Sequence, residues 1–396
     1  MSSRAQPPAG RWTSPVRGLW RNVRVRRVAF QLGFVVLVAA LLLYLYSNLL
    51  TNLRRLRIGT SFAFLDQSAG FAIANSDFQP SESFLAAILV GVQNTVLVSL
   101  LGIVLATMLG FVVGVARLST NWLVRRAAAG YVETLRNVPV LVVILFWYLG
   151  VILQMPPIER AVEWGGLVLS NRGLVIPWLK RTGDPTVFLT VVGAGVVVAG
   201  ATAVWRTRRW DRTGLPHHRI LWAGGILLAA ALVGFVAGGF PLSPSLPERG
   251  DLGTEHGYRL TPEYGALLLG LSVYTASHIA EIVRGGILAV PKGQTEAANA
   301  LALSGFQRLR FVVLPQAFRI MIPPLANQYL NLTKNSSLGV AIAYPEVTRV
   351  VRIAIGQQAP APQAVAVLML VYLGFSLAIS LVANLLNRRL ALKGRI

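Results

Sequence analysis

Residues 85–116 read LAAILVGVQNTVLVSLLGIVLATMLGFVVGVA, a stretch without a single charged side chain. A helix of about 20 apolar residues is long enough to cross the hydrocarbon core of a bilayer. Because this stretch is longer than one crossing requires, we expect it to tilt or to begin in the membrane interface. The stretch predicts a membrane-spanning helix, and therefore a helical membrane protein.

Similar apolar runs recur along the chain, so we predict an all-α integral membrane protein with about eight transmembrane helices. The first run follows an Arg-rich segment and lacks a small-residue cleavage site, which argues against a cleaved signal peptide. The run at 318–343 is the weakest because Pro323, Pro324 and Lys334 interrupt it, and seven spans is the alternative. The expected spans are 28–50, 85–116, 138–155, 185–204, 220–240, 264–290, 318–343 and 364–386.

The composition fits a membrane protein and excludes several other classes. Of the 396 residues, 54% are hydrophobic and only 13% are charged, whereas an ordinary soluble domain has about 25% charged residues. The chain has no cysteine, which excludes disulfides, thiolate metal sites and cysteine nucleophiles. It also lacks a phosphate-binding G-x-x-x-x-G-K-[ST] loop and an H-E-x-x-H pair. We therefore expect no catalytic residue, no metal site and no cofactor bound by this chain.

The net charge of +22 would suit a nucleic-acid-binding protein, but its distribution fits a membrane topology better. If residues 1–27 face the cytoplasm and the chain crosses eight times, the cytoplasmic segments carry 24 Lys and Arg against 3 acids, and the outer segments carry 11 of each. Such an excess of basic residues is the positive-inside pattern. The sequence predicts that both termini are cytoplasmic and that no nucleic acid is bound.

We divide the chain into five regions. Residues 1–27 form an Arg-rich cytoplasmic segment, either an inner-leaflet anchor or a basic tail, and residues 28–84 hold the first span and an outer loop. Residues 85–155 and 264–396 form the core in two parts. Residues 156–263 are an inserted block, in which a hairpin of the spans 185–204 and 220–240 lies between two loops. The hairpin has almost no polar residue within its spans, so we expect it to face lipid.

The loop 291–319 reads PKGQTEAANALALSGFQRLRFVVLPQAFR and lies on the predicted cytoplasmic side between two spans. We expect Thr295 to cap a short helix that begins at Glu296, whose carboxylate favours the positive end of a helix. Gly305 is expected to end this helix, and Pro315 to start the next span. A short helix of small residues that faces the cytosol suits docking into a groove on another protein.

The order Glu296-Ala297-Ala298, then a spacer, then Leu314-Pro315 resembles the EAA loop of ABC-importer permeases. The glycine that is usual six residues after the Glu is Ala302 here, with Gly305 three residues further on. Because Ala302 is small, we expect docking to be intact. The resemblance implies that the residues coupled to the ATPase are Glu296, Ala297, Ala298, Ala302, Gly305, Leu314 and Pro315.

Other motifs resemble the polar amino-acid branch of these permeases, the histidine and glutamine permeases. The likeness covers roughly residues 85–155 and 260–390, the five-span core of that branch. The extra first span and the hairpin resemble the long permease of general L-amino-acid (Aap/Bzt-like) systems. The motifs are Gly91-Val92-Gln93-Asn94-Thr95, Arg117-Leu118-Ser119, Glu133 to Pro139, Phe146-Trp147-Tyr148, Tyr274-Thr275-Ala276, Ala280 to Ile287 and Asn331 to Leu338.

The resemblance implies a function and a set of partners. We expect a multi-pass permease subunit of the bacterial inner membrane, which moves amino acids into the cytoplasm by alternating access. The implied partners are a second permease subunit, expected to form a heterodimer, a periplasmic amino-acid-binding protein and two cytoplasmic ATPase subunits that hold ATP and Mg. A secondary transporter driven by an ion gradient, with Glu281 and His278 as ion sites, is the alternative.

The span 264–290 carries an ionisable residue, Glu281, and such residues mark functional sites by default. Helical spacing places Thr275, His278 and Glu281 along one strip. Two readings are open. Either Glu281 offers its charge to the α-ammonium group of a substrate, or it forms an ion pair with Arg284, one turn later, that only stabilises packing.

The short polar side chains of Asn335, Ser336 and Ser337 are the second candidate, because the resemblance places this stretch beside the translocation path. Lys334 is interpreted as a structural or interfacial charge. Val143 stands where many relatives carry a Gln, and this loss of an amide weakens the case for a complete substrate site in one subunit. A partner permease would then supply the better site.

Overall fold

The protein is represented by a computed structural model that describes residues 23–55, 61–181, 186–213, 218–239, 242–250 and 253–390. Most of the Arg-rich segment expected at 1–27 and the end of the C-terminal tail lie outside these ranges. The helices are α2 (Val23–Arg55), α3 (Phe84–Ala116), α4 (Trp122–Asn137), α5 (Val140–Leu145), α6 (Thr186–Thr213), α7 (Arg219–Ala237), α8 (Pro262–Leu288), α9 (Lys292–Ala300), α10 (Gly305–Arg308), α11 (Leu314–Asn335), α12 (Val347–Gly356) and α13 (Ala361–Leu390).

The described residues contain seven helices that are long and apolar enough to cross a membrane, or eight if one bent pair is counted as a span. Seven of the expected spans are therefore confirmed as single helical segments. The run expected at 138–155 is different, because it is the second arm of the bent pair, in which α4 is followed by α5 and the π-helical η2 (Phe146–Ile152). The helix direction changes by 109° between the two arms. Pro139 causes the break: the residue before it, Val138, is extended with φ −101° and ψ 133°, as the proline ring requires.

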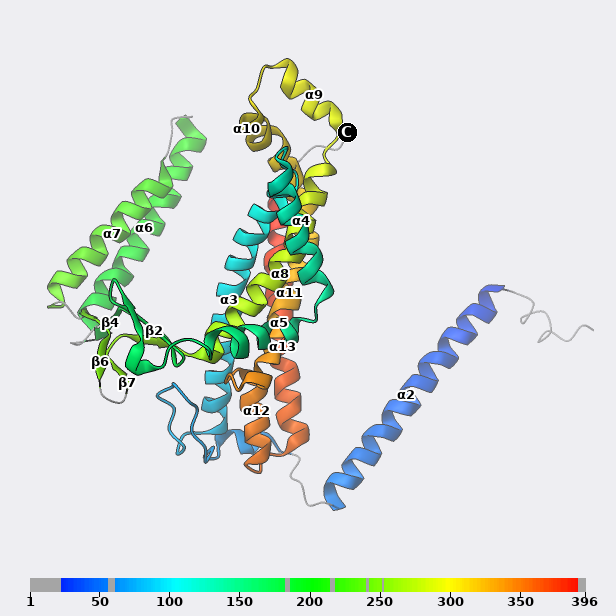
Figure 1. The fold of residues 1–396 in the computed structure, drawn as a ribbon. Helices are drawn as coiled ribbons and strands as arrows, with labels where there is room; N and C mark the ends of the chain where they lie inside the picture. Colours follow the sequence, from blue (N-terminus) through cyan, green and yellow to red (C-terminus); the bar gives the residue numbers. More distant parts are fainter. Residues whose placement is uncertain are drawn as a thin grey trace, which may run out of the picture.

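The centre of the bundle is the contact between α3 and α8, which cross in the middle of Figure 1. Small residues at every fourth position of α3, namely Gly102, Ala106, Gly110 and Gly114, are buried. An added Cβ at Gly110 would lie 2.7 Å from Cβ of Ile279, and one at Gly114 would lie 2.7 Å from the carbonyl oxygen of Ala280. Without these glycines the two helices could not approach as closely as they do, which is how small residues act in membrane helix pairs.

A second apolar cluster lies at the end of the molecule formed by α12, below the bundle in Figure 1. The fully buried carboxylate of Glu346 accepts hydrogen bonds of 2.7 Å from the amide groups of Thr348 and Arg349 and caps α12. Burial raises the pKa of Glu346. The side-chain amide of Asn94 donates to the carbonyl of Pro345 at 2.9 Å, so α12 is fixed to α3.

The inserted block differs from the expected loops, because it contains β-structure. Strands β1 (Val162–Trp164), β2 (Leu167–Ser170), β3 (Gly173–Ile176) and β8 (Tyr258–Leu260) form one antiparallel sheet in the order β1-β2-β3-β8. Strand β4 (Trp178–Arg181) pairs with β5 (Leu242–Ser245), and β6 (Glu248–Gly250) pairs with β7 (Gly253–Glu255). Gly173 has a φ of +107°, and a Cβ there would lie 2.2 Å from the carbonyl oxygen of Leu260, so only glycine permits this pairing.

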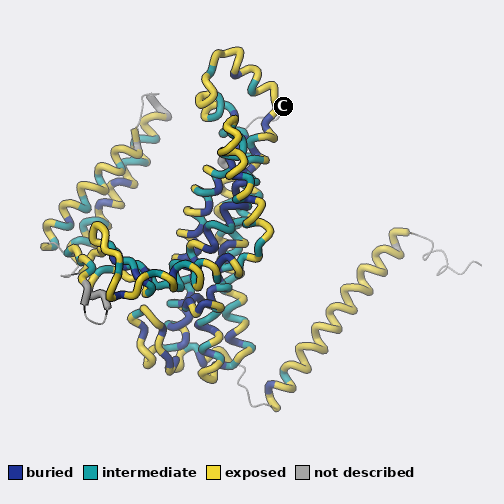
Figure 2. Tube along the Cα trace, in the orientation of Figure 1, coloured by how far each residue is buried: buried dark blue, intermediate teal, exposed yellow. Residues whose placement is uncertain are grey.

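The α6–α7 hairpin and α2 stand apart from the bundle in Figure 1. Figure 2 shows α2 exposed almost throughout and the hairpin as a mixture of exposed and intermediate residues with few buried ones, whereas α3 and α8 of the bundle bury one face. Within the apolar windows of the two hairpin helices only 11% and 6% of the residues are buried, and in α2 none is. The expectation that the hairpin is peripheral to the core is consistent with this arrangement.

Candidate coupling surface and polar strip

The loop between α8 and α11 forms one end of the molecule, at the top of Figure 1, and we call it the α9 end. The expected cap at Thr295 is wrong, because α9 begins at Lys292 with Pro291 in the N-cap position. Pro291 has a φ of −54°, which suits the entry into a helix, so α9 starts four residues earlier than expected. Thr295 and Glu296 lie inside the helix, and Glu296 is exposed.

The expected end of this helix at Gly305 is also wrong, because α9 ends at Ala300. The chain turns at Ala302, which has a φ of +55°, a left-handed conformation that glycine adopts more easily than alanine. Gly305 instead begins α10, after a capping box in which the Ser304 hydroxyl accepts from the amide of Gln307 and the Gln307 side chain accepts from the amide of Ser304.

Two side-chain hydrogen bonds hold α9 against the following helix. The guanidinium of Arg308 donates to Oδ1 of Asn299 at 2.6 Å, and Nε2 of Gln316 donates to Oε1 of Gln294 at 3.2 Å. The helical path is continuous from α10 through the π-helical η4 (Leu309–Val313) into α11. Pro315 lies in the first turn of α11, as expected, although the helical segment extends back to Gly305.

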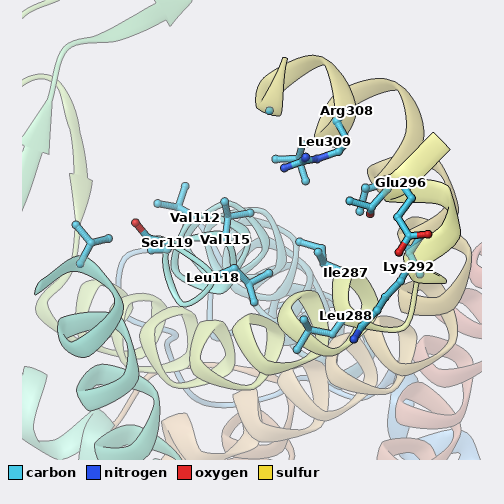
Figure 3. Close-up of a pocket in the computed structure, with 16 residues that line it drawn as sticks. Val112, Val115, Leu118, Ser119, Ile287, Leu288, Lys292, Glu296, Arg308 and Leu309 are labelled. Carbon is cyan, nitrogen blue, oxygen red and sulfur yellow. The ribbon is translucent and has the colours of Figure 1, made fainter. Parts of the chain in front are cut away.

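The α9 end has the surface of a docking site. Leu301, Phe306 and Phe311 lie within eleven residues of the chain and are 75%, 69% and 62% exposed, respectively. Neighbouring exposed apolar side chains are typical of interaction sites. Beside them is a groove, whose lining comes from the last turn of α3, the end of α8, and α9 and α10 (Figure 3). Lys292, Glu296 and Arg308 are the charged residues in its lining. The site combines exposed apolar side chains with an adjacent, mostly apolar groove that carries three charged residues.

An ion cluster lies next to this groove on α8. The Glu281 carboxylate is paired with Arg117, the residue that follows α3, and with Arg284 on α8, whose Nη2 is 2.5 Å from Oε1. The three side chains are only partly exposed. Glu281 and Arg117 also line a polar cavity of about 410 Å³ together with Glu133, Arg136 and Asn137 of α4. The cluster thus joins three helices near the α9 end.

The other residues of the predicted strip separate into two faces of α8. Thr275 is buried, whereas His278 and Glu281 are partly exposed. Nδ1 of His278 lies 3.2 Å from the carbonyl oxygen of Tyr274. The Ser277 hydroxyl lies 3.3 Å from the same nitrogen. In the tautomer in which Nδ1 donates to the carbonyl, Nε2 of the neutral ring is an acceptor. The accessible strip therefore consists of Tyr274, His278 and Glu281.

The polar residues Asn335, Ser336 and Ser337 lie where α11 tightens into the 3₁₀-helix η5 (Ser336–Ile342). The Ser336 hydroxyl is buried and donates to the carbonyl of Thr333 at 2.7 Å. The Ser337 hydroxyl donates to the carbonyl of Lys334 at 2.8 Å. Both hydroxyls satisfy backbone groups of their own helix, and Asn335 is half-buried.

The whole length of the chain matches known transport proteins. The general L-amino acid transport system permease protein AapQ of Rhizobium johnstonii is 41% identical over 96% of this chain and 96% of its own length. This chain belongs to the amino-acid ABC transporter permeases. The putative amino-acid ABC transporter permease YhdX of Escherichia coli is 42% identical over 94% of the chain and 96% of its own length.

Two further sequence comparisons agree with this family. The glutamate/glutamine/aspartate/asparagine transport system permease BztB of Rhodobacter capsulatus is 33% identical over 94% of the chain and 96% of its own length. Residues 262–392 match the family of binding-protein-dependent transport system inner membrane components. A solved amino acid ABC transporter aligns over 77% of this chain and 95% of its own with a TM-score of 0.47 and 17% identity. The permease is a multi-pass inner-membrane protein and a subunit of an ABC importer, a class that works with ATPase and binding-protein partners.

The reasoning from sequence missed two features of the permease. Arg117 was noted only as part of a motif, although it is an ion partner of Glu281. Its sequence separation of 164 residues left no local signal. The exposed apolar side chains of Leu301 and Phe306 could have been found, because they are large apolar residues in a short loop whose helix is otherwise built of small ones.

Proposed function

We propose that this permease moves amino acids into the cytoplasm by alternating access, and that separate ATPase subunits drive it by docking on the α9 end. The exposed apolar side chains of Leu301, Phe306 and Phe311 carry this proposal, because such side chains at the end of the molecule suit a protein partner. The exposed Glu296 lies on α9 beside this cluster. The ATP and Mg belong to the ATPase subunits, and the permease itself catalyses no reaction.

The last turn of α3 offers a route from this surface into the membrane. Val112, Val115 and Leu118 line the docking groove, and Arg117 of the same turn pairs with Glu281 on α8. A displacement of α9 against the groove would therefore shift the end of α3, and the ion pair between Arg117 and Glu281 would transmit this shift to the polar strip of α8. Rigid-body rocking of packed helices is a common way to switch between two states.

We further propose that the strip and the α11–η5 turn line the path of the substrate. The Nε2 atom of His278 would provide a hydrogen-bond acceptor there, and Asn335 and Ser337, which are partly exposed, would supply short polar groups. Ser336 is buried, so it would become accessible only if the α11–η5 turn moved. The two arginines bound to Glu281 favour its role as an ion-pair residue over direct contact with an α-ammonium group. A substrate would meet the Glu281 carboxylate only after one arginine had moved away.

We also propose which subunits assemble with this permease and how it is oriented in the membrane. Val143 is a buried aliphatic residue of α5, so this position provides no amide for a substrate. This supports a heterodimer in which a second permease subunit supplies the better part of the substrate site. A periplasmic amino-acid-binding protein would deliver the substrate at the α12 end. The N- and C-termini would then be cytoplasmic, in line with the excess of Lys and Arg on that side.

The substitution Glu296→Lys tests the docking role. We expect co-purification of the ATPase with the tagged permease to fall by roughly tenfold or more, because one residue at the centre of an interface can contribute about 2 kcal/mol. The same substitution at the opposite end, Glu82→Lys, is the control and should leave ATPase retention unchanged. Normal ATPase retention and normal uptake with Glu296→Lys would contradict the proposal.

The same preparation tests the alternative of an ion-coupled secondary transporter. The permease purified alone and placed in vesicles should not accumulate amino acids under a proton or sodium gradient. Accumulation under either gradient without ATPase subunits would favour the alternative.

A further inference from the structure

The α6–α7 hairpin has no part in the proposed transport mechanism. Its two helices pack on each other, most closely where an added Cβ at Gly195 would lie 2.4 Å from Cβ of Ala230. They bury little else: Val197, Leu228 and Val233 are each more than half exposed. Helices of this hydropathy that expose apolar side chains on most of their surface are surrounded by lipid in a membrane. We therefore expect lipid to cover the apolar surface of the hairpin.

One end of the hairpin carries a cluster of basic and aromatic residues, Trp205-Arg206-Thr207-Arg208-Arg209-Trp210. The guanidinium carbon of Arg206 lies 4.6 Å from the ring centre of Trp222 on α7, and that of Arg209 lies 5.7 Å from the ring centre of Trp205. These cation–π contacts hold two arginines on indole faces. The rings of Trp205 and Trp222 are also 57% and 54% exposed, so the cluster is open to its surroundings.

The position of the cluster favours a phospholipid headgroup as the ligand. Both candidate spans of the hairpin end here, at Trp210 and Ile220, and exposed tryptophans at the end of a span prefer the headgroup region. Residues 205–219 hold five arginines and one acid, Asp211, so the segment attracts anions. A guanidinium offers several N–H donors in one plane, which suits the oxygens of a phosphate group.

We propose that Arg206, Arg208 and Arg209, with the rings of Trp205 and Trp222, form a binding site for the phosphate headgroup of an anionic phospholipid. The hairpin end lies on the same side of the molecule as α9 (Figure 1). The ligand is therefore a lipid of the cytoplasmic leaflet, a statement that rests on the orientation in the proposed function. The site gives the hairpin a role: it binds the permease to an anionic phospholipid, and it lies away from the proposed path of the substrate.

The test uses the assembled transporter in nanodiscs of phosphatidylcholine with a fraction of phosphatidylglycerol, and native mass spectrometry of the lipids that remain bound after mild release. The unsubstituted permease should retain phosphatidylglycerol in preference to phosphatidylcholine. The triple substitution Arg206→Gln, Arg208→Gln and Arg209→Gln should reduce this retention by roughly tenfold or more, since each basic side chain near an anionic surface adds to the affinity.

A matched control removes the same charge elsewhere on the same proposed side. Arg125 and Arg126 of α4 and Arg388 of α13 are exposed, and their triple substitution to Gln should leave retention almost unchanged. The variant Trp222→Leu keeps every charge but removes the ring beneath Arg206, and it should weaken retention by a smaller factor. Intact assembly with the ATPase shows that each variant is folded.

Three outcomes would overturn the site. Equal losses in both triple variants would mean that the basic residues act only through the overall charge of that side. Loss of a protein subunit in place of lipid would identify the cluster as a protein contact. Displacement of the lipid by millimolar inorganic phosphate would indicate a site for a soluble anion. Lipid retention is measured without transport, so failure of the proposed function would leave this result unaffected.

Discussion

At the scale of single residues, Ala302 shows how backbone conformation limits the coupling loop. Alanine with a φ of +55° is strained by about 1 kcal/mol, and glycine would relieve that strain. We expect Ala302→Gly to stabilise the turn after α9 and to slow hydrogen exchange of the loop 291–319 in the purified transporter. Hydrogen–deuterium exchange followed by mass spectrometry measures this change.

The control for this prediction is Ala300→Gly, two residues earlier. Ala300 is the last residue of α9, where glycine costs part of the roughly 0.5–1 kcal/mol that it costs inside a helix. The two substitutions should therefore shift exchange in opposite directions. Faster exchange in both variants would show that the turn at Ala302 is not under strain.

Arg117 and Arg284 bind the same carboxylate but differ in what they connect. Arg117 joins the end of α3 to α8, whereas Arg284 lies on α8 itself. We expect Arg117→Gln to lower the amino acids taken up per ATP hydrolysed by roughly fivefold, the lower end of typical coupling between sites. Arg284→Gln should have a smaller effect because Glu281 remains tied to α3. Uptake and ATP hydrolysis are measured together in proteoliposomes for both variants. An equal loss of uptake per ATP hydrolysed in the two variants would refute the role of α3.

The sequence could identify Glu281 because an ionisable residue within an apolar run stands out locally. It could also suggest Arg284 as a partner, since three residues separate the two on one helix. It could not reveal Arg117, because that contact depends on the packing of α3 against α8. The conformation of Ala302 could not be predicted either. Its small size suggested that docking is intact, but this position requires a positive φ, which glycine adopts more easily than alanine.

At the scale of elements, the glycines of α3 set its distance from α8. Gly110→Ala would place a Cβ 2.7 Å from Cβ of Ile279 and 2.9 Å from the carbonyl oxygen of Ala276. Overpacking of this kind costs about 1–3 kcal/mol, so we expect a lower temperature of thermal unfolding, measured by tryptophan fluorescence in detergent. Gly285→Ala on α8 is the control, because no atom lies within 4 Å of its added Cβ. A similar decrease for both variants would contradict the close contact.

The spans were predictable because length and hydropathy act over a whole segment and need no tertiary information. The bent pair was not, because α4 carries Arg125, Arg126, Glu133 and Arg136 and was interpreted as a cytoplasmic loop. The strands of the inserted block were missed for a different reason. Each strand has only three or four residues. In addition, β3 pairs with β8, which follows the whole hairpin in the sequence, so no local sequence pattern indicates the sheet.

At the scale of the whole molecule, the orientation in the membrane can be tested directly because the chain contains no cysteine. Gly293 is an exposed residue of α9 with no atom near its added Cβ, and Asp77 is exposed in the loop at the α12 end. In intact cells, an impermeant maleimide should label the chain with Asp77→Cys but not the chain with Gly293→Cys. Both should react in broken membranes. Labelling of the Gly293→Cys chain from outside would refute the coupling proposal.

The pairing of β3 with β8 has a consequence for the segment between them. Ile176 and Tyr258 are register partners, so the chain leaves the sheet and returns to it at a single point. The segment 177–257 therefore begins and ends at neighbouring positions of the sheet. Segments whose two ends lie close together tolerate insertion and removal best. Deletion of residues 177–257 would therefore leave the two cut ends beside each other in the sheet, with the two parts of the helical bundle still joined across it.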